Sequence, residues 1–182
     1  MTPWRQTFAA AVALGAALLV GCEGIRYYGQ AVDGHLSLMA SRQPIEAALA
    51  DPATASRQRL ALVLEIRDFA SEALALPDNR SYRSVVPSSD EGVVWSIVAT
   101  PPYSLAPREW CYLLVGCASY RGYFDRGEAE AYARALAADG LDVTVDPVPA
   151  YSTLGWFDDP LPAGILRWPD HDVAAIVFHE LA

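Results

Sequence analysis

The alternation of apolar and polar residues predicts helices in the first part of the chain, a small sheet in the middle and a helix at the end. Apolar residues recur every three or four positions over 27–49, with a break allowed at Pro44, and again in a segment that starts at 51–52 and stops at 77–79. This is the spacing of amphipathic helices. One face of the first helix carries Tyr28, Val32, Met39 and either His35 or Leu36. We expect His35 to be a packed or partly exposed core residue.

Short apolar runs in the middle of the chain predict strands. Residues 93–99 and 111–115 are such runs, and residues 141–145 alternate as a half-buried strand does. A helix predicted over 127–139, which Gly140 ends, lies between the last two. A strand, a helix and a strand within about 35 residues indicate a right-handed crossover, with the strands around 111–115 and 141–146 parallel. We therefore expect an α+β fold with N-terminal helices and a small mixed sheet that contains one βαβ crossover.

The segment 169–182 predicts a helix that ends inside a chemical motif. Four of its residues share one face at three- and four-residue spacing: Val173, Ile176, Val177 and Glu180. The segment ends in His-Glu-Leu-Ala, and a histidine in the next position would complete H-E-x-x-H. In that motif two imidazoles bind zinc and the glutamate is the general base. His179 is thus a candidate zinc ligand and Glu180 a candidate catalytic base on a zincin-like terminal helix. The alternative is an ordinary amphipathic helix end.

The N-terminal residues have the pattern of an export signal. A short polar start with Arg5 precedes an apolar run over residues 8–20. This run is shorter than the roughly 20 residues of a membrane span and has the length of the apolar part of a signal peptide. It ends in Leu-Val-Gly-Cys at 19–22, which resembles the lipobox of bacterial lipoproteins.

The lipobox resemblance implies that Cys22 is lipidated and becomes the mature N-terminus. Residues 1–21 are then a lipoprotein signal peptide, and residues 22–182 form a single α+β domain. This domain would be lipid-anchored in the bacterial cell envelope on its periplasmic side, an oxidising space. A plain signal peptide or a short anchor with an incidental cysteine is the alternative.

Composition excludes several classes of function. The chain has 182 residues and a formal net charge of −9, with 22 acidic and 13 basic residues. Such a balance argues against nucleic acid as a partner, because little is available to neutralise phosphates. Every basic residue is arginine, so Schiff-base chemistry, a P-loop lysine and a lysine base are excluded.

The two remaining cysteines, Cys111 and Cys117, are expected to be buried thiols. Six residues of straight strand span about 20 Å, whereas a disulfide requires Cα atoms within about 7 Å. Only a bend at Gly116 would bring them together. A catalytic cysteine is less expected, because nothing in the sequence places a histidine beside either thiol.

Several phrases of the sequence resemble a family of bacterial predicted aminopeptidases, which are mostly lipoproteins. The resemblance runs in order through most of the chain, and its most specific phrases are Tyr-Arg-Gly-Tyr-Phe, Tyr-Ser-Thr-Leu-Gly-Trp-Phe and Phe-His-Glu-Leu-Ala. The matching segments are Tyr27–Ala31, Gly34–Leu36, Arg42–Ile45, Arg67–Ala70, Leu76–Pro77, Ser81–Tyr82, Val94–Trp95, Trp110–Cys111, Gly116–Cys117, Tyr120–Phe124, Ala150–Phe157, Asp159–Pro160 and Phe178–Ala182.

This resemblance implies a zinc-dependent aminopeptidase that removes N-terminal residues from peptides. His179 would be the first zinc ligand, and Glu180 the base that takes a proton from water. The second histidine and an acidic ligand in an Asn-Glu helix would lie beyond residue 182, so we expect the chain as written to be inactive and to hold zinc poorly. The alternative is a non-catalytic envelope lipoprotein that acts as a binding or structural module.

Two further side chains each have two interpretations, and the oligomeric state is open. Tyr151, in the aromatic segment 151–157, could donate a hydrogen bond to a developing oxyanion in a substrate groove, or the aromatic residues could be core. Core is the favoured interpretation. Arg121 could bind a carboxylate or form a structural pair with an acidic neighbour, and the pair is favoured.

Overall fold

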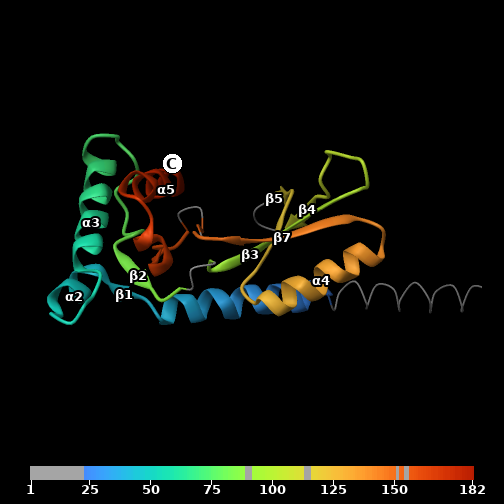
Figure 1. The fold of residues 1–182 in the computed structure, drawn as a ribbon, viewed down its shortest axis with the longest axis horizontal. Coiled ribbons are helices and arrows are strands. Elements are labelled where there is room, and N and C mark those ends of the chain that lie inside the picture. Colours follow the sequence, from blue (N-terminus) through green and yellow to red (C-terminus); the bar gives the residue numbers. More distant parts are fainter. Residues whose placement is uncertain (1–22, 89–91, 113–115, 151, 154–155) are drawn as a thin grey trace, which may run out of the picture.

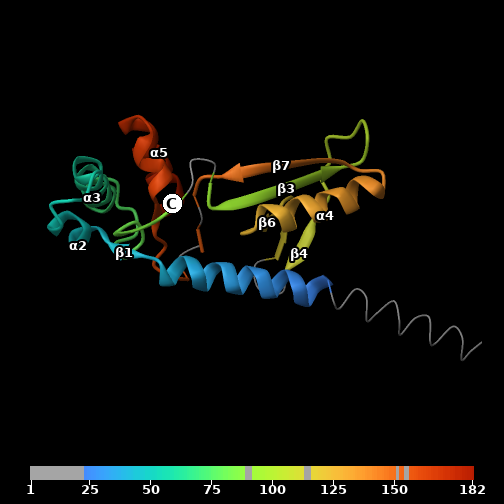
Figure 2. The same ribbon diagram turned by 60° about the horizontal axis from the view of Figure 1, so that its bottom comes forward.

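The fold is α+β, as expected, and its elements gather around two hydrophobic cores. The computed structural model describes residues 23–88, 92–112, 116–150, 152–153 and 156–182. Figure 1 shows one group of elements around α3 and α5, and a second group around the strands β3 and β7 with α4. The helical residues 23–40 run along the second group, and their far end leads to β1 of the first group (Figures 1 and 2). We refer to the two groups as the first core and the second core.

The first core contains α5 and is built mainly from helices. Its elements are β1 (Gln43–Pro44), α2 (Ile45–Ala50), α3 (Arg57–Glu72), β2 (Ser84–Val86), β8 (Leu161–Pro162), the 3₁₀ helix η1 (Ala163–Arg167) and α5 (Asp170–Leu181). The three short strands form a mixed sheet in which β2 is central, antiparallel to β1 and parallel to β8. Ile45, Val63 and Val177 are fully buried between these elements.

The second core lies between an antiparallel sheet and α4. Its elements are β3 (Val94–Thr100), β4 (Trp110–Tyr112), β5 (Gly116–Ala118), β6 (Arg121–Tyr123), α4 (Arg126–Ala138) and β7 (Asp142–Val148). The central strand β3 pairs antiparallel with both β6 and β7. Asp125 caps α4 because its carboxylate accepts a hydrogen bond from the N–H of Glu128 at 2.8 Å.

A crossover is present, but the predicted first strand was wrong. Because β6 and β7 are both antiparallel to β3, they run parallel to each other on either side of it, and α4 connects them. The described part of the predicted strand 111–115 instead belongs to a separate hairpin, in which β4 pairs with β5, and residues 113–115 lie outside the described residues. The expectation failed because apolar periodicity identifies a strand and does not identify its partner.

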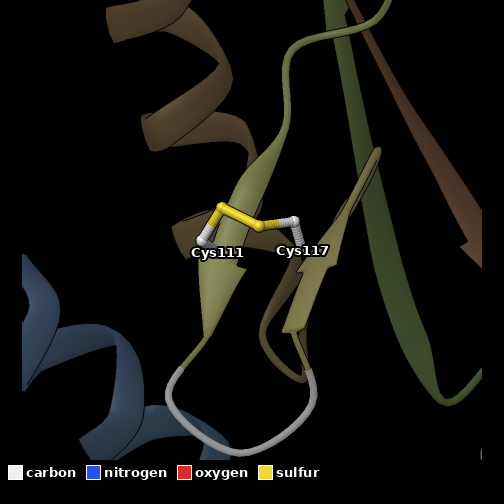
Figure 3. The surroundings of a disulfide bond; sticks show 2 residues. All are labelled: Cys111 and Cys117. Atoms are coloured by element: carbon white, nitrogen blue, oxygen red, sulfur yellow. A yellow bond between two sulfur atoms is a disulfide. The ribbon is translucent and has the colours of Figure 1, made fainter.

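The prediction of two buried thiols is also wrong, since Cys111 and Cys117 form a disulfide on an exposed hairpin (Figure 3). The two residues face each other across the β4–β5 pair, with their Cα atoms 3.9 Å apart. The chain therefore reverses between them and does not continue straight. Gly116 provides part of the reversal, because its φ of 77° lies in the left-handed region that glycine adopts without steric cost.

The first predicted helix ends earlier than expected and exposes its apolar face. Helical residues 23–40 are followed by β1 and then α2, so the helix breaks near Pro44 as allowed. Val32 and Leu36 are 57% and 60% exposed. The other side of the helix packs instead, and a Cβ on Gly34 would lie 2.2 Å from the ring of Phe124. Within the described residues, no helix is long and apolar enough to cross a membrane.

Candidate functional site

The helix α5 is fixed at its start by α3 and by its own apolar face. Arg59 of α3 donates hydrogen bonds to the carbonyl oxygens of Leu166 (2.8 Å) and Trp168 and pairs with Asp170, the first residue of α5. Val173 and Val177 are 1% and 0% exposed in the first core. These contacts set the rotation of α5 and therefore determine which residues of its last turn face the protein.

Glu180 lies on the buried side of α5, as the spacing predicted. Val173, Val177 and Leu181 are buried, and Glu180 is half-buried with Ile176 on the same face. His179 is about 100° farther round the helix and is exposed. It lines a shallow groove together with Trp168, Pro169, Asp172, Ala175 and Ile176. The imidazole is thus accessible from outside, whereas the neighbouring carboxylate is partly withdrawn from water.

A buried acid, Asp159, lies near Glu180 although the two come from different segments. The Asp159 side chain belongs to the loop before β8 and is 2% exposed. Each of its carboxylate oxygens accepts hydrogen bonds from Thr153: the backbone N–H donates at 2.7 Å and the hydroxyl at 2.8 and 3.0 Å. These bonds compensate part of the cost of burying the charge.

The segment Ser81–Tyr82 is hydrogen-bonded to the loop that carries Asp159. The Tyr82 N–H donates to the Asp159 carbonyl oxygen at 2.7 Å, and the Asp159 N–H donates to the Ser81 hydroxyl at 3.2 Å. Tyr82 has a φ of 62°, which is unusual for a residue with a side chain. Its ring is buried in the first core, with Val177 and Leu181 of α5 in the same cluster. Tyr82, Asp159 and Glu180 therefore come from three separate segments and converge at one end of the first core.

Burial makes the Glu180 carboxylate a stronger base than an exposed glutamate. Desolvation raises the pKa of Glu180, the charge of His179 lowers it, and the carboxylate of Asp159 raises it further. Desolvation also raises the pKa of Asp159, opposed by the bonds from Thr153 and by the charge of His35. The site thus combines a desolvated base with an exposed imidazole at adjacent positions of one helix.

The described residues do not supply a complete set of metal ligands. No group of three or more histidine, cysteine, aspartate or glutamate side chains that could hold a metal ion occurs among them. A catalytic zinc site takes three protein ligands and keeps a position for water. The exposed His179 imidazole fits the role of one ligand, and at least one of the others would have to come from outside the described residues.

Two predicted site residues, Cys22 and Tyr151, lie outside the described residues. The expectation that the aromatic segment near Tyr151 is core is wrong for Trp156 and Phe157, which are 66% and 53% exposed. The ring of Phe157 instead lies 4.8 Å from the ring of His35. His35 is half-buried, in agreement with its predicted place on the first helix.

Arg121 is a structural residue, as favoured. Its side chain is buried, pairs with Glu23 at 2.9 Å and donates a hydrogen bond to the Tyr132 hydroxyl at 3.1 Å. The guanidinium also lies over the rings of Tyr27 and Tyr132, at 4.0 and 4.5 Å from their centroids. These contacts attach the helical residues 23–40 to the second core, away from α5.

Sequence reasoning gave no role to Tyr82 or Asp159. Both stand in segments that resemble the aminopeptidase family, Ser81–Tyr82 and Asp159–Pro160. No local signal distinguishes them, because an aspartate before a proline is typical of a turn. Their importance depends on tertiary contacts between positions that are 77 residues apart (159 − 82).

The chain thus combines an α+β fold with a terminal helix that ends in a His-Glu pair. The chain belongs to the family described as "Putative aminopeptidase", whose model matches residues 26–182. This membership indicates a hydrolase that acts on peptides. Neither the curated proteins nor the solved structures show a significant match to the chain.

Proposed function

We propose that the complete protein is a zinc-dependent aminopeptidase, anchored to the membrane of the bacterial cell envelope, that removes N-terminal residues from peptides. One observation carries the proposal: in a chain of the aminopeptidase family, α5 ends with an exposed imidazole beside a half-buried carboxylate. This is the relation between the first ligand and the base that H-E-x-x-H requires.

In this proposal Glu180 is the general base and His179 a zinc ligand. Zinc, when bound, polarises a water molecule and the peptide carbonyl. The Glu180 carboxylate takes a proton from the attacking water and returns it to the leaving amine. Its raised pKa suits this exchange, because a carboxyl with a pKa closer to neutral binds the proton more readily and can still release it.

The envelope location has its own support. The apolar run 8–20 with Cys22 after it is the observation that favours lipid attachment. The disulfide between Cys111 and Cys117 is compatible with an oxidising space outside the cytoplasm. Peptides in that space are then the expected substrates, and zinc is the expected cofactor.

The test compares two substitutions in the complete protein. Glu180→Gln preserves the shape of the side chain and removes the basic carboxylate, so hydrolysis of an aminoacyl substrate should fall by about 10²–10⁴-fold while zinc content is unchanged. His179→Ala should lose zinc. Both quantities are measured on the same preparations, by a chromogenic aminoacyl substrate and by metal analysis.

Two matched substitutions are the controls. Glu65→Gln changes an exposed glutamate of α3, and His171→Ala an exposed histidine of α5, so both should retain activity and zinc. Full activity in Glu180→Gln would place the base elsewhere, and loss of zinc in that variant would make Glu180 a ligand. A complete protein that neither binds zinc nor hydrolyses peptides would support the non-catalytic lipoprotein.

A further inference from the structure

The helix at residues 23–40 carries a stripe of apolar side chains that is largely exposed. Ile25, Tyr28, Val32 and Leu36 are between 41% and 76% exposed. At 100° per residue these four side chains fall within an arc of about 80°, and Met39 falls in the same arc. No charged residue of the helix occupies that arc. We refer to these residues as the apolar stripe.

The opposite side of the same helix packs on the second core. The ring of Tyr27 stacks on that of Tyr112, with centroids 5.6 Å apart, and Gln30 accepts a hydrogen bond from the N–H of Phe124 at 3.1 Å. Gly34 lies under the ring of the same phenylalanine. Figure 2 shows the helix along one edge of the molecule, with α4, α5 and β7 on the same side of it. The apolar stripe therefore points away from the described elements.

The apolar stripe begins three residues after the cysteine that is proposed to carry the lipid. Helical structure is described from Glu23 onward. Ile25 can lie no more than about 10 Å from Cys22, since a residue spans at most about 3.5 Å of extended chain. The acyl chains on Cys22 would lie in the hydrocarbon and the cysteine itself in the headgroup layer, which is about 5–8 Å thick. The anchor would thus hold the first turn of the helix at the bilayer surface.

A lipid surface fits the apolar stripe better than a second copy of the chain does. A stable protein interface takes roughly 20–30 residues from each partner, far more than the stripe offers. An interfacial helix needs only an apolar face, which sinks about 5–10 Å into the headgroup boundary. The one arginine of this helix, Arg26, pairs with Glu128 at 3.0 Å and leaves no basic face for anionic lipids. The lipid on Cys22 must therefore supply the attachment, and the stripe sets the orientation.

We propose that the apolar stripe lies in the headgroup region of the bilayer that holds the lipid of Cys22, with Ile25, Val32 and Leu36 directed toward the acyl chains. The axis of the helix is then parallel to the membrane surface, and the two cores lie on its periplasmic side. This placement rests on the lipid anchor of the proposed function and is independent of the zinc chemistry.

Quenching by lipid of a fluorophore on the apolar stripe tests this placement. The complete lipidated protein is reconstituted in phosphatidylcholine vesicles with or without a nitroxide-labelled lipid, and Val32→Cys carries the fluorophore NBD. Cys111 and Cys117 are bridged and the sulfur of Cys22 carries the lipid, so the parent protein, treated alike, gives the background. A nitroxide at headgroup depth should reduce the fluorescence of the Val32→Cys label at least about twofold, because the stripe lies at that depth.

Ser37→Cys is the matched control, because it is an exposed position of the same helix about 140° from Val32. Its label should be quenched less than about 1.2-fold. Leu36→Glu should restore the fluorescence of the Val32→Cys label, since a carboxylate is costly to place beside acyl chains, whereas Ser37→Glu should not. Both side chains are exposed, so neither new charge enters a core.

Three results would overturn the placement. Equal quenching at positions 32 and 37, in a protein that incorporates lipid and sediments with the vesicles, contradicts the placement alone and leaves the anchor intact. A Val32→Cys label with the blue-shifted emission of an apolar environment but no quenching shows that protein covers the stripe, from a second copy or from elsewhere in the complete chain. A parent that neither incorporates lipid nor sediments contradicts the lipid anchor of the proposed function, and the placement of the stripe with it.

Discussion

Arg67 shows how a single buried side chain holds the candidate site in place. It is 0% exposed and lies on the buried side of α3. Its guanidinium donates to the carbonyl oxygens of Ser81, Pro77 and Asn79 at 3.0, 2.6 and 2.9 Å, and to Ser71. An arginine can satisfy several carbonyl groups at once because it has five donors in a fixed plane. The hydrogen bonds from Arg67 therefore hold the segment that leads to Tyr82 in place.

Replacing Arg67 with methionine should destabilise the protein. The change removes the donors for several buried carbonyl groups and leaves them unpaired, so we expect a loss of about 2–4 kcal/mol in the free energy of unfolding. Urea denaturation measures the loss. Arg134→Met, at an α4 position whose side chain is 71% exposed, should change stability by less than about 0.5 kcal/mol. An equally small effect for Arg67→Met would contradict the role assigned to these hydrogen bonds.

The sequence located the His-Glu pair on its helix but did not identify the residues that surround it. His179 and Glu180 were identifiable because helical spacing and the H-E pair are local signals, and the structure places the two residues on different sides of α5 as expected. Arg67, Tyr82 and Asp159 were not assigned. Arginine, tyrosine and aspartate are all common on surfaces, and only contacts across long sequence separations make these three part of the site.

Local signals located the helices and strands well and their pairing poorly. The helix α4 and the strand β7 agree closely with the predicted ranges 127–139 and 141–146. The partner of β7 is β3, which comes before the disulfide hairpin, so four elements (β4, β5, β6 and α4) separate the paired strands in sequence. The prediction of a straight strand from Cys111 onward was wrong for a similar reason. A few backbone torsions near Gly116 decide that the chain reverses, and the pattern of apolar residues contains no information about these torsions.

The disulfide should stabilise its own hairpin and leave the candidate site unaffected. It closes a short loop on the second core, so the chain-entropy estimate is about 2 kcal/mol. The double substitution of Cys111 and Cys117 by serine should therefore lower the free energy of unfolding by up to that amount. Aminoacyl hydrolysis and zinc content should be unchanged, because α5 belongs to the first core. Loss of activity in a variant that remains folded would show that the hairpin contributes to the site.

In the whole molecule, the helical residues 23–40 connect the two cores. Tyr27 packs against the second core, and Glu23 pairs with Arg121 there. The same helix brings His35 beside Phe157 and then leads through β1 into the first core. Its outward face carries Ile25, Val32 and Leu36, which are 76%, 57% and 60% exposed. The chain reaches this helix directly after Cys22, so a lipid on that residue would keep the helix close to the bilayer.

Membrane attachment should depend on Cys22 alone among the cysteines. We expect Cys22→Ser in the full precursor to abolish lipid labelling and to move the protein from the membrane fraction to the soluble fraction, because acyl chains supply the anchoring free energy. Radiolabelled fatty acid incorporation and ultracentrifugation measure both effects. Cys111→Ser should label and partition like the parent. A Cys22→Ser variant that still labels and sediments with membranes would refute the lipobox assignment.

The contact between the helix at residues 23–40 and the second core also sets the earliest time at which this helix can be stabilised by packing. Gln30 accepts a hydrogen bond from the N–H of Phe124, 94 positions later in the chain, and Gly34 packs under the same phenylalanine. A ribosome adds roughly 5–20 residues per second, so the partner of this helix is made roughly 5–20 s after the helix itself. Helices owe most of their stability to tertiary packing. The helix at residues 23–40 therefore cannot acquire these contacts until the chain has been made at least as far as Phe124.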